Sequence, residues 1–312
     1  MAEPQVAEQG EPIGHIDSIQ CETVRFAYPN TAEPVLKDAS LTVDAAQKVA
    51  LVGESGCGKS TLAKLLFQYY PDYSGDILFN GRQVRTLDRT ALYRRVGYIA
   101  QTAYLFHDTI RNNICLHEDF PDEQLAHAIA AAGLTDWVAS LPDGLDTVIS
   151  ENGKNLSGGQ RQRIGIARAL IVEPEFIIAD EPISALDMSI RAQVLNLLRH
   201  LQKARGITYL FIAHDLSVMR YISDRIAVIH KGDIVELADA EELVNHAIHP
   251  YTRSLLSAIP MPNPRLERKK KLLVYDPAMH DYTAEPPQWQ ELRPNHFVLC
   301  NATEAAQWIR ES

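Results

Sequence analysis

The chain has 312 residues and a formal net charge of −10 at pH 7, so it is long enough for one large domain with an appendage, and its acidity argues against nucleic-acid binding as the main role. Its four cysteines lie far apart and form neither a Cys-x-x-Cys pair nor a Cys/His cluster, which indicates a reducing compartment without disulfides or structural zinc. No apolar run approaches the ~20 residues that span a bilayer and the N-terminus is acidic, so we expect a cytoplasmic protein that reaches a membrane only through a partner.

The N-terminal segment precedes the first expected strand. Residues 1–17 are rich in Glu, Pro and Gly, a composition that predicts a flexible lead-in. Residues 19–26 alternate between apolar and polar side chains, as a half-buried strand does. Tyr28 follows this strand. Its position alone is typical of an ordinary aromatic at a strand end, but an aromatic just before a nucleotide-binding strand could also stack on a base.

A glycine-rich loop follows an apolar strand at residues 48–52 and leads into a helix at residues 62–67. Two glycines separated by four residues, then Lys and Ser, match the phosphate-loop pattern. The glycines let backbone N–H groups close around phosphate oxygens, and the helix N-terminus adds a partial positive charge. Lys59 can then reach the β- and γ-phosphates, and the Ser60 hydroxyl can ligate Mg²⁺. The sequence therefore predicts a nucleoside-triphosphate site at Gly53, Glu54, Ser55, Gly56, Cys57, Gly58, Lys59, Ser60 and Thr61.

Short strands and a helical insertion come next. Residues 76–79 and 96–100 are typical of strands, with an Asn-Gly turn and a helical stretch near 87–95 between them. Gln101 follows the second strand directly, and a polar side chain at the C-terminal end of a strand in such a sheet points toward the ligand. It could complete the Mg²⁺ shell or position water. From about 121 to 141 the pattern is helical, which indicates an insertion in an otherwise α/β chain.

Two further motifs lie downstream. Residues 156–160 read Leu-Ser-Gly-Gly-Gln and lead into a helix, with Ser157 as a good N-cap. The two glycines again permit close backbone approach to an anion. A buried apolar strand at 176–179 then ends in two acids. Asp180 is placed to hold Mg²⁺ through water, and Glu181 can orient and polarise an attacking water.

Taken together, these motifs resemble those of the ATP-binding cassette (ABC) ATPases. Residues 156–160 are similar to the signature of the family, residues 176–181 to its second ATPase motif, and residues 184–187 to its dimer-contacting loop. The resemblance covers about residues 18–245 and includes every motif of the family.

The resemblance implies a role for each candidate residue, with ATP as the nucleotide and Mg²⁺ as its metal. Tyr28 would stack on adenine, Glu181 would be the catalytic base, and His214, which follows a buried strand, would be the switch histidine that contacts the γ-phosphate. Because the family's signature acts across a dimer, it would complete the ATP site of a second ATPase subunit. The implied nucleotide contacts outside the loop are Tyr28, Gln101, Ser157, Gly158, Gly159 and Gln160, and the implied Mg²⁺ ligands are Ser60, Gln101 and Asp180.

The two halves of the chain resemble different subfamilies. Residues 104–114 and 146–153 are similar to ABC exporters. Residues 179–187 and 249–256, the latter beginning His-Pro-Tyr-Thr-Arg, look like the second ATPase subunit of oligopeptide importers. The surface that grips the membrane subunit in this family would come from the exporter-like half, which predicts poor coupling to ordinary oligopeptide permease subunits.

The expected fold is α/β: a P-loop NTPase of the ABC type with a RecA-like core sheet, an antiparallel β subdomain, a helical subdomain and a C-terminal extension. We expect a flexible lead-in at 1–17 and an ATPase domain at 18–250 that contains the helical subdomain at about 102–160. An extension of the oligopeptide-transporter type should occupy 251–312.

The resemblance implies ATP hydrolysis coupled to transport, with oligopeptide or dipeptide import as the first choice. The chain would be a peripheral subunit on the cytoplasmic face of the cell membrane, with transmembrane permease subunits and a second ABC ATPase subunit as partners and no nucleic acid. An exporter-type ATPase is the alternative. A non-transport ABC protein would carry a long coiled-coil insertion or two cassettes, and a small-molecule P-loop kinase would lack residues 156–160 and a His at position 214.

Overall fold

The computed structural model of the protein describes residues 10–31, 33–260, 270–283 and 285–311, and in it the chain forms two compact units. Unit 1 comprises the residues up to 19, residues 44–47 and residues 79–210. Unit 2 comprises residues 20–43, 48–78 and 211–312. Each unit is therefore assembled from segments that are distant in the sequence.

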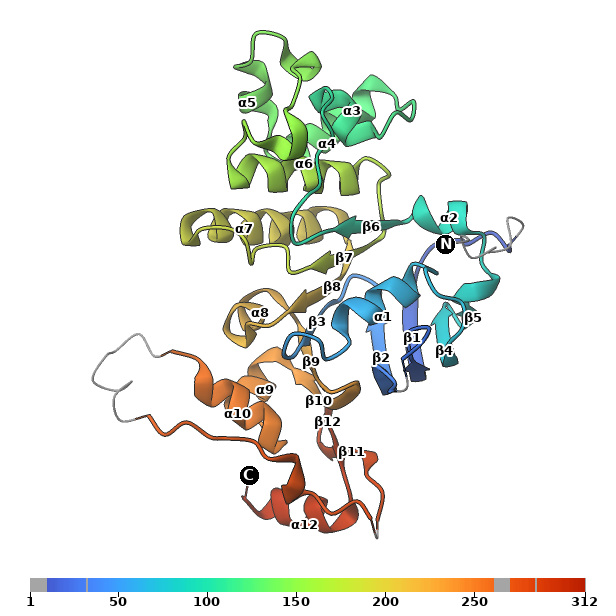
Figure 1. Ribbon diagram of the computed structural model, residues 1–312, viewed down its shortest axis with the longest axis vertical. Helices are drawn as coiled ribbons and strands as arrows, with labels where there is room; N and C mark the ends of the chain where they lie inside the picture. The colour runs from blue at the N-terminus through green and yellow to red at the C-terminus, as the bar shows by residue number, and fades with distance from the viewer. Residues whose placement is uncertain (1–9, 32, 261–269, 284, 312) are drawn as a thin grey trace. The chain divides into compact units, whose positions relative to one another are not determined.

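Unit 1 combines a few strands with most of the helices. Its strands are β5 (Arg82–Gln83), β6 (Val96–Ile99), β7 (Phe176–Asp180) and the first half of β8 (Thr208–Ala213). Its α-helices are α2 (Arg89–Tyr93), α3 (Ile110–Cys115), α4 (Asp122–Ala131), α5 (Thr135–Ala139), α6 (Gly158–Leu170) and α7 (Met188–Arg205). Short 3-10 turns are η1 (Val84–Thr86), η2 (Gly144–Asp146) and η3 (Glu151–Gly153). Helices α3 and α4 pack against α6, as the green part of Figure 1 shows.

The strand β7 is the buried centre of unit 1. It is a continuous apolar run from Phe176 to Ala179, and all four side chains are buried, as expected for a strand that is covered on both faces. It pairs in parallel with β6, with Val96 opposite Phe176. Parallel pairing places the residues that follow both strands at the same edge, where Gln101 and the two acids lie.

Residues 10–17 pack within unit 1. The backbone of Glu11 forms a parallel bridge with Leu87, and the side chains of Ile13 and Ile16 are buried. The described part of the expected lead-in is therefore held in place by specific contacts. The first nine residues lie outside the described part of the chain.

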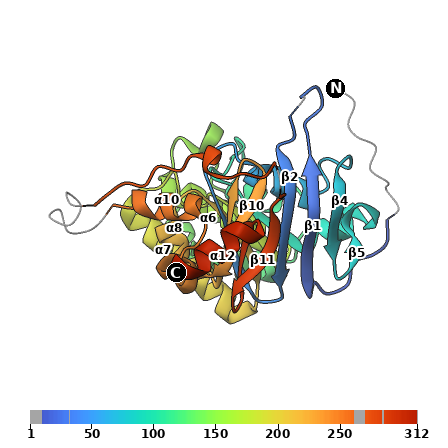
Figure 2. The ribbon, with the colours of Figure 1, turned by 90° about the horizontal axis from the view of Figure 1, so that it is seen from below.

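Unit 2 contains a mixed sheet. Its strands are β1 (Ser18–Phe26), β2 (Leu36–Asp44), β3 (Lys48–Val52), β4 (Ser74–Phe79), β9 (Arg225–His230), β10 (Asp233–Asp239), β11 (Gln288–Arg293) and β12 (His296–Cys300). Its helices are α1 (Lys59–Leu66), α8 (Leu216–Ile222), α9 (Ala240–Asn245), α10 (Pro250–Ala258) and α12 (Ala302–Glu311), with a 3-10 turn η4 (Pro277–Met279). The strand order is β4-β1-β2-β10-β9-β3, and Figure 2 shows β4, β1, β2 and β10 side by side.

The C-terminal tail continues this sheet. Strand β12 pairs antiparallel with β10, and β11 pairs antiparallel with β12. Val298 and Cys300 of β12 form a small core with Ala305 and Trp308 of α12 and with Ile248. Residues 288–311 are therefore a folded part of unit 2.

A buried carboxylate ties this tail to α10. Glu236 of β10 and His296 of β12 are both fully buried, and His296 Nε2 lies 2.7 Å from Glu236 Oε1. The same carboxylate accepts the backbone N–H of Ile248 at 2.6 Å and that of His249 at 3.2 Å. Three hydrogen-bonding groups from two segments, residues 248–249 and strand β12, thus converge on one side chain.

Candidate functional site

The candidate residues fall into two groups, one in each unit. Unit 2 carries the glycine-rich loop, Tyr28 and His214, whereas unit 1 carries Gln101, residues 157–160 and the two acids. Each group is a local arrangement within its own unit.

The glycine-rich loop connects β3 to α1. Gly56 and Gly58 have φ values of 81° and 112°, which side chains other than glycine rarely adopt. At Gly58, the N-cap of α1, a Cβ atom would also lie 2.7 Å from Leu36 Cδ2. The backbone conformation therefore requires glycine there, and the space for a side chain is narrow.

Lys59 is folded back into the loop. Its side chain is buried, and Nζ donates to the carbonyl oxygens of Gly53 and Glu54 at 2.7 Å each. Cys57 Sγ lies 3.6 Å from the same ammonium group, and burial raises the pKa of this thiol. The loop is thus closed around its own lysine, which must leave these carbonyls in order to contact a phosphate.

Tyr28 is fixed beside the start of α1. Its hydroxyl lies 2.9 Å from Thr61 Oγ1, and its half-buried ring meets the ring of Tyr70 edge-on at 5.5 Å. His214 follows β8 and is exposed, and the next residue, Asp215, caps α8. Stacking on adenine and contact with a γ-phosphate remain predictions for these two residues.

In unit 1, the strand ends bring the polar residues together. Gln101 Nε2 donates to Glu181 Oε2 at 3.3 Å, and the Tyr98 hydroxyl donates to Asp180 Oδ2 at 3.0 Å. Both acids are half-buried. A role of Gln101 in the Mg²⁺ shell or in positioning water stays a prediction, and the sequence did not single out Tyr98.

Glu181 has an unusual backbone conformation. Its φ is 46°, in the left-handed region, which costs a residue other than glycine about 1–3 kcal/mol. The surrounding turn holds it there, because the N–H and the hydroxyl of Ser184 both donate to the Glu181 carbonyl, at 3.2 and 3.0 Å. Such conformations concentrate at functional sites. The sequence offered no signal for it.

Residues 157–160 form a complete capping box at the start of α6. Ser157 Oγ accepts the N–H of Gln160 at 3.1 Å, and Gln160 Oε1 accepts the N–H of Ser157 at 2.9 Å. Gly159 is buried, and a Cβ atom there would lie 3.0 Å from Ile190 Cγ2 on α7. Ser157 itself is exposed. Gly159 therefore serves helix packing, while Ser157 stays accessible to a ligand or partner.

The candidate metal ligands of each unit are oxygen atoms. Gln101 and Asp180 in unit 1 offer amide and carboxylate oxygens, and Ser60 in unit 2 offers a hydroxyl, all of which are donor types that suit Mg²⁺. Within the described residues, no cluster of three or more His, Cys, Asp or Glu side chains could hold a metal by itself. Mg²⁺ typically uses one or two protein ligands together with substrate phosphates, so the residues fit Mg²⁺ that arrives with a nucleotide.

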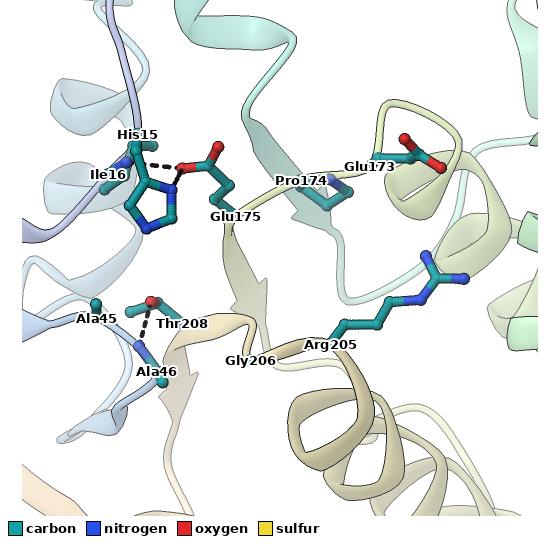
Figure 3. Close-up of a pocket in the computed structure, with 10 residues that line it drawn as sticks. All are labelled: His15, Ile16, Ala45, Ala46, Glu173, Pro174, Glu175, Arg205, Gly206 and Thr208. Carbon is teal, nitrogen blue, oxygen red and sulfur yellow. Dashed lines mark hydrogen bonds and ion pairs between the residues drawn. The ribbon is translucent and has the colours of Figure 1, made fainter.

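A cavity of about 530 Å³ lies in unit 1, away from these residues (Figure 3). Its lining residues are His15, Ile16, Ala45, Ala46, Glu173, Pro174, Glu175, Arg205, Gly206 and Thr208. Glu175 Oε2 lies 2.8 Å from His15 Nδ1, and Thr208 Oγ1 accepts the N–H of Ala46 at 2.9 Å. The cavity adjoins the start of β7, and Asp180 is at the other end of that strand. It is therefore distinct from the edge that carries the acids.

Two family models match the chain. A model described as ABC transporter matches residues 36–184, which include the glycine-rich loop, residues 157–160 and both acids. A model described as Oligopeptide/dipeptide transporter, C-terminal region, matches residues 235–283. None of the helices in the described residues has the length and apolar character of a membrane span.

Curated relatives align with most of the chain. The oligopeptide transport ATP-binding protein OppF of Streptococcus pyogenes serotype M1 is 46% identical over 292 residues, which cover 88% of this chain and 92% of the relative. The dipeptide transport ATP-binding protein DppF of Lactococcus lactis subsp. cremoris is 41% identical over 288 residues, which cover 88% and 90%. The likeness to peptide-transport proteins is therefore not confined to the downstream half.

A solved structure shares the fold. The structure of a bacterial Atm1-family ABC exporter with ATP bound superposes with a TM-score of 0.73 at 32% identity. The match covers 81% of this chain and 44% of the exporter chain, so this chain corresponds to less than half of that exporter. Together with the family model, the match confirms the expected α/β fold of the ABC type.

Proposed function

Because the chain belongs to the ABC transporter family, among its oligopeptide and dipeptide transport ATP-binding proteins, we propose that it binds and hydrolyses ATP to energise peptide transport. The observation that carries the proposal is the glycine-rich loop closed around the buried Lys59. Transmembrane permease subunits and a second ATPase subunit are the proposed partners. The chain would act as a peripheral subunit on the cytoplasmic face of the membrane.

Unit 2 would hold the phosphates. The backbone N–H groups of the loop and the N-terminus of α1 offer donors and partial positive charge to the phosphate oxygens. Lys59 would exchange the carbonyls of Gly53 and Glu54 for the β- and γ-phosphates, so that one buried ammonium keeps acceptors in both states. Tyr28 would stack on adenine, with its ring oriented by the hydrogen bond to Thr61.

Unit 1 would carry the hydrolysis. Glu181 would orient the attacking water and accept its proton, and Gln101, which already bonds to Glu181, would hold that carboxylate in place. Asp180 would be the Mg²⁺ ligand of this unit, as Ser60 would be in unit 2, and Mg²⁺ supplies charge compensation for the phosphates when bound. His214, which belongs to unit 2, would contact the γ-phosphate.

The exposed signature would serve a second subunit. Ser157 and Gly158 lie at the surface end of α6, and the capping box fixes their backbone before any partner arrives. A helix N-terminus of this kind suits an anion, such as the γ-phosphate of ATP bound to another copy or to a related subunit.

The test of nucleotide binding is a titration with ATP. Lys59→Ala should abolish measurable binding, because no other side chain can replace the buried ammonium, and circular dichroism should show a folded protein. Lys64→Ala is the matched control, since Lys64 is an exposed lysine in the last turn of the same helix. Unchanged ATP affinity in Lys59→Ala would contradict the assignment of the loop.

The test of cargo is complementation in a bacterial strain that lacks its own oligopeptide ATPase subunit. The exporter-like segments predicted poor coupling to oligopeptide permease subunits, but the identity to peptide-transport relatives extends over 88% of the chain, so the unaltered chain should restore uptake of a labelled peptide. Lys59→Ala should not restore it. ATP hydrolysis without any restored uptake would favour the exporter-type alternative, whose fold the solved structure shares.

A further inference from the structure

The His-Pro-Tyr-Thr-Arg motif at residues 249–253 has no role in the function proposed above. In unit 2 it forms the first turn of α10. Tyr251 is almost fully buried, with 1% of its surface exposed, and its hydroxyl accepts the backbone N–H of Glu54 at 3.3 Å. A residue nearly two hundred positions away in the sequence therefore contacts the glycine-rich loop.

This contact falls on one particular peptide group. The N–H of Glu54 and the C=O of Gly53 belong to the same planar unit. Lys59 Nζ donates to that carbonyl at 2.7 Å, and Tyr251 accepts from the N–H. The peptide is thus held at both ends. When Lys59 moves to a phosphate, Tyr251 is the contact that stays.

Tyr251 is itself immobilised by packing. Its ring lies 4.1 Å from the ring of His230 and 5.4 Å from that of Tyr275, measured between centroids. His230 follows Ile229, whose carbonyl oxygen would lie 2.2 Å from a Cβ atom on Gly53. The loop, the end of β9 and the tyrosine are therefore in direct contact, so the ring cannot move without displacing its neighbours.

The turn that presents Tyr251 is held by the tail. His249 caps α10, because its Nδ1 accepts the N–H of Tyr251 at 3.1 Å. Glu236 accepts the N–H groups of Ile248 and His249, and His296 of β12 holds Glu236. Burial raises the pKa of Tyr251, so the hydroxyl keeps its proton at neutral pH.

We propose that Tyr251 is a positioning residue for ATP binding, which fixes the Gly53–Glu54 peptide while Lys59 exchanges its carbonyl acceptors for phosphate oxygens. The inference rests on the function proposed above. It gives the C-terminal region a role in nucleotide affinity, because the tail holds the turn on which Tyr251 stands. Without the hydroxyl, the peptide can rotate once Lys59 has left, and the loop loses part of its binding shape.

The test uses Tyr251→Phe in the full chain, which keeps the ring and removes only the hydroxyl. A hydrogen bond of ordinary strength corresponds to a rise of about three- to ten-fold in the Kd for ATP. The KM of hydrolysis should rise by the same factor and kcat should stay within about two-fold, because the contact is made equally in the ground and transition states.

Tyr275→Phe is the matched control. It removes a hydroxyl from the same aromatic cluster, and within the described residues that hydroxyl makes no hydrogen bond. Its Kd and KM should not change. A wild-type Kd in Tyr251→Phe, or an equal loss in both variants, would overturn the inference, since the effect would then be absent or would come from packing alone.

Amide hydrogen exchange gives a readout without nucleotide. The Glu54 amide should exchange faster in Tyr251→Phe than in the unaltered chain and at an unchanged rate in Tyr275→Phe. Equal protection in all three proteins would overturn the inference even if Tyr251→Phe folds poorly enough to affect the titration.

If the unaltered chain binds no ATP, both proposals fail. If Lys59→Ala loses binding and Tyr251→Phe does not, only this inference fails.

Discussion

Replacing Glu236 by Gln should destabilise unit 2 strongly, although the side chains have the same size. Glu236 is fully buried, and its two oxygens receive the N–H groups of Ile248 and His249 and lie next to His296 Nε2. Oε1 serves Ile248 and His296, and Oε2 serves His249. Gln offers one acceptor oxygen in place of two.

The cost can be estimated group by group. If the amide oxygen takes the place of Oε1, the NH₂ group takes the place of Oε2 and faces the N–H of His249. Those two buried donors, the NH₂ group and the N–H of His249, are then left without an acceptor. Each costs about 1–3 kcal/mol. In the reverse orientation the NH₂ group faces the N–H of Ile248, so at least two buried donors again lack an acceptor. We expect a loss of about 3–5 kcal/mol, which lies within the sum for two such donors.

Thermal unfolding measures this loss. For a domain of this size, 1 kcal/mol corresponds to about 2–4 °C, so Tm should fall by about 6–20 °C. Glu241→Gln is the control: it removes a carboxylate from the neighbouring helix α9, where Glu241 forms an exposed ion pair with Arg220. Exposed pairs contribute little, so its Tm should barely change.

Two results would refute this reasoning. A fall of less than about 2 °C in Glu236→Gln would mean that water or a local rearrangement satisfies the donors. Equal falls in Glu236→Gln and Glu241→Gln would mean that burial of the carboxylate does not decide the cost.

Further predictions concern chemistry, reactivity, pH and coupling. Glu181→Gln should keep ATP binding but lower kcat by about 10²–10⁴, measured by steady-state hydrolysis; near-normal turnover would place the base elsewhere. Because burial raises the pKa of Cys57, its alkylation by iodoacetamide should be slow at pH 7, accelerate as the pH rises and be blocked by ATP. Mass spectrometry measures the rate, and a rate independent of pH would contradict the raised pKa. Burial lowers the pKa of His249 to about 3 from an ordinary value near 6.5, so the unfolded chain binds the extra proton first and stability falls as the pH drops from about 6.5 toward 3. His249→Asn keeps a capping side chain without this titration, and its urea stability should decline less between pH 7 and pH 5 than that of the unaltered chain; an equal decline would count against the assignment. Replacing the exposed Tyr104 and Phe106 (56% and 48% exposed) by Ser should leave ATP affinity unchanged and reduce peptide uptake, whereas full uptake would show that these rings do not take part in coupling.

The local motifs could be predicted from the sequence because their chemistry demands fixed residues at fixed spacing. Glycine at position 58 is required by a φ of 112°, and Ser157 with Gln160 encodes a capping box within four residues. Such signals need no knowledge of distant segments. The family comparison then confirmed the ABC fold and the peptide-transport relatives.

Contacts between distant segments could not be predicted in the same way. The bond from Glu54 to Tyr251 and the one from Tyr98 to Asp180 join residues that share no local pattern. The composition of residues 1–17 also suggested flexibility, yet Ile13 and Ile16 are buried. A few apolar side chains can hold a polar segment against a neighbouring surface.

The left-handed backbone at Glu181 sets stability against activity. Glycine or asparagine would adopt a φ of 46° more readily, so either substitution should relieve the strain and raise the free energy of unfolding. Either would also remove the carboxylate that hydrolysis is proposed to need. Laboratory evolution for heat resistance alone would therefore drift toward inactive chains at this position, and selection for thermostable variants has to include turnover from the first round.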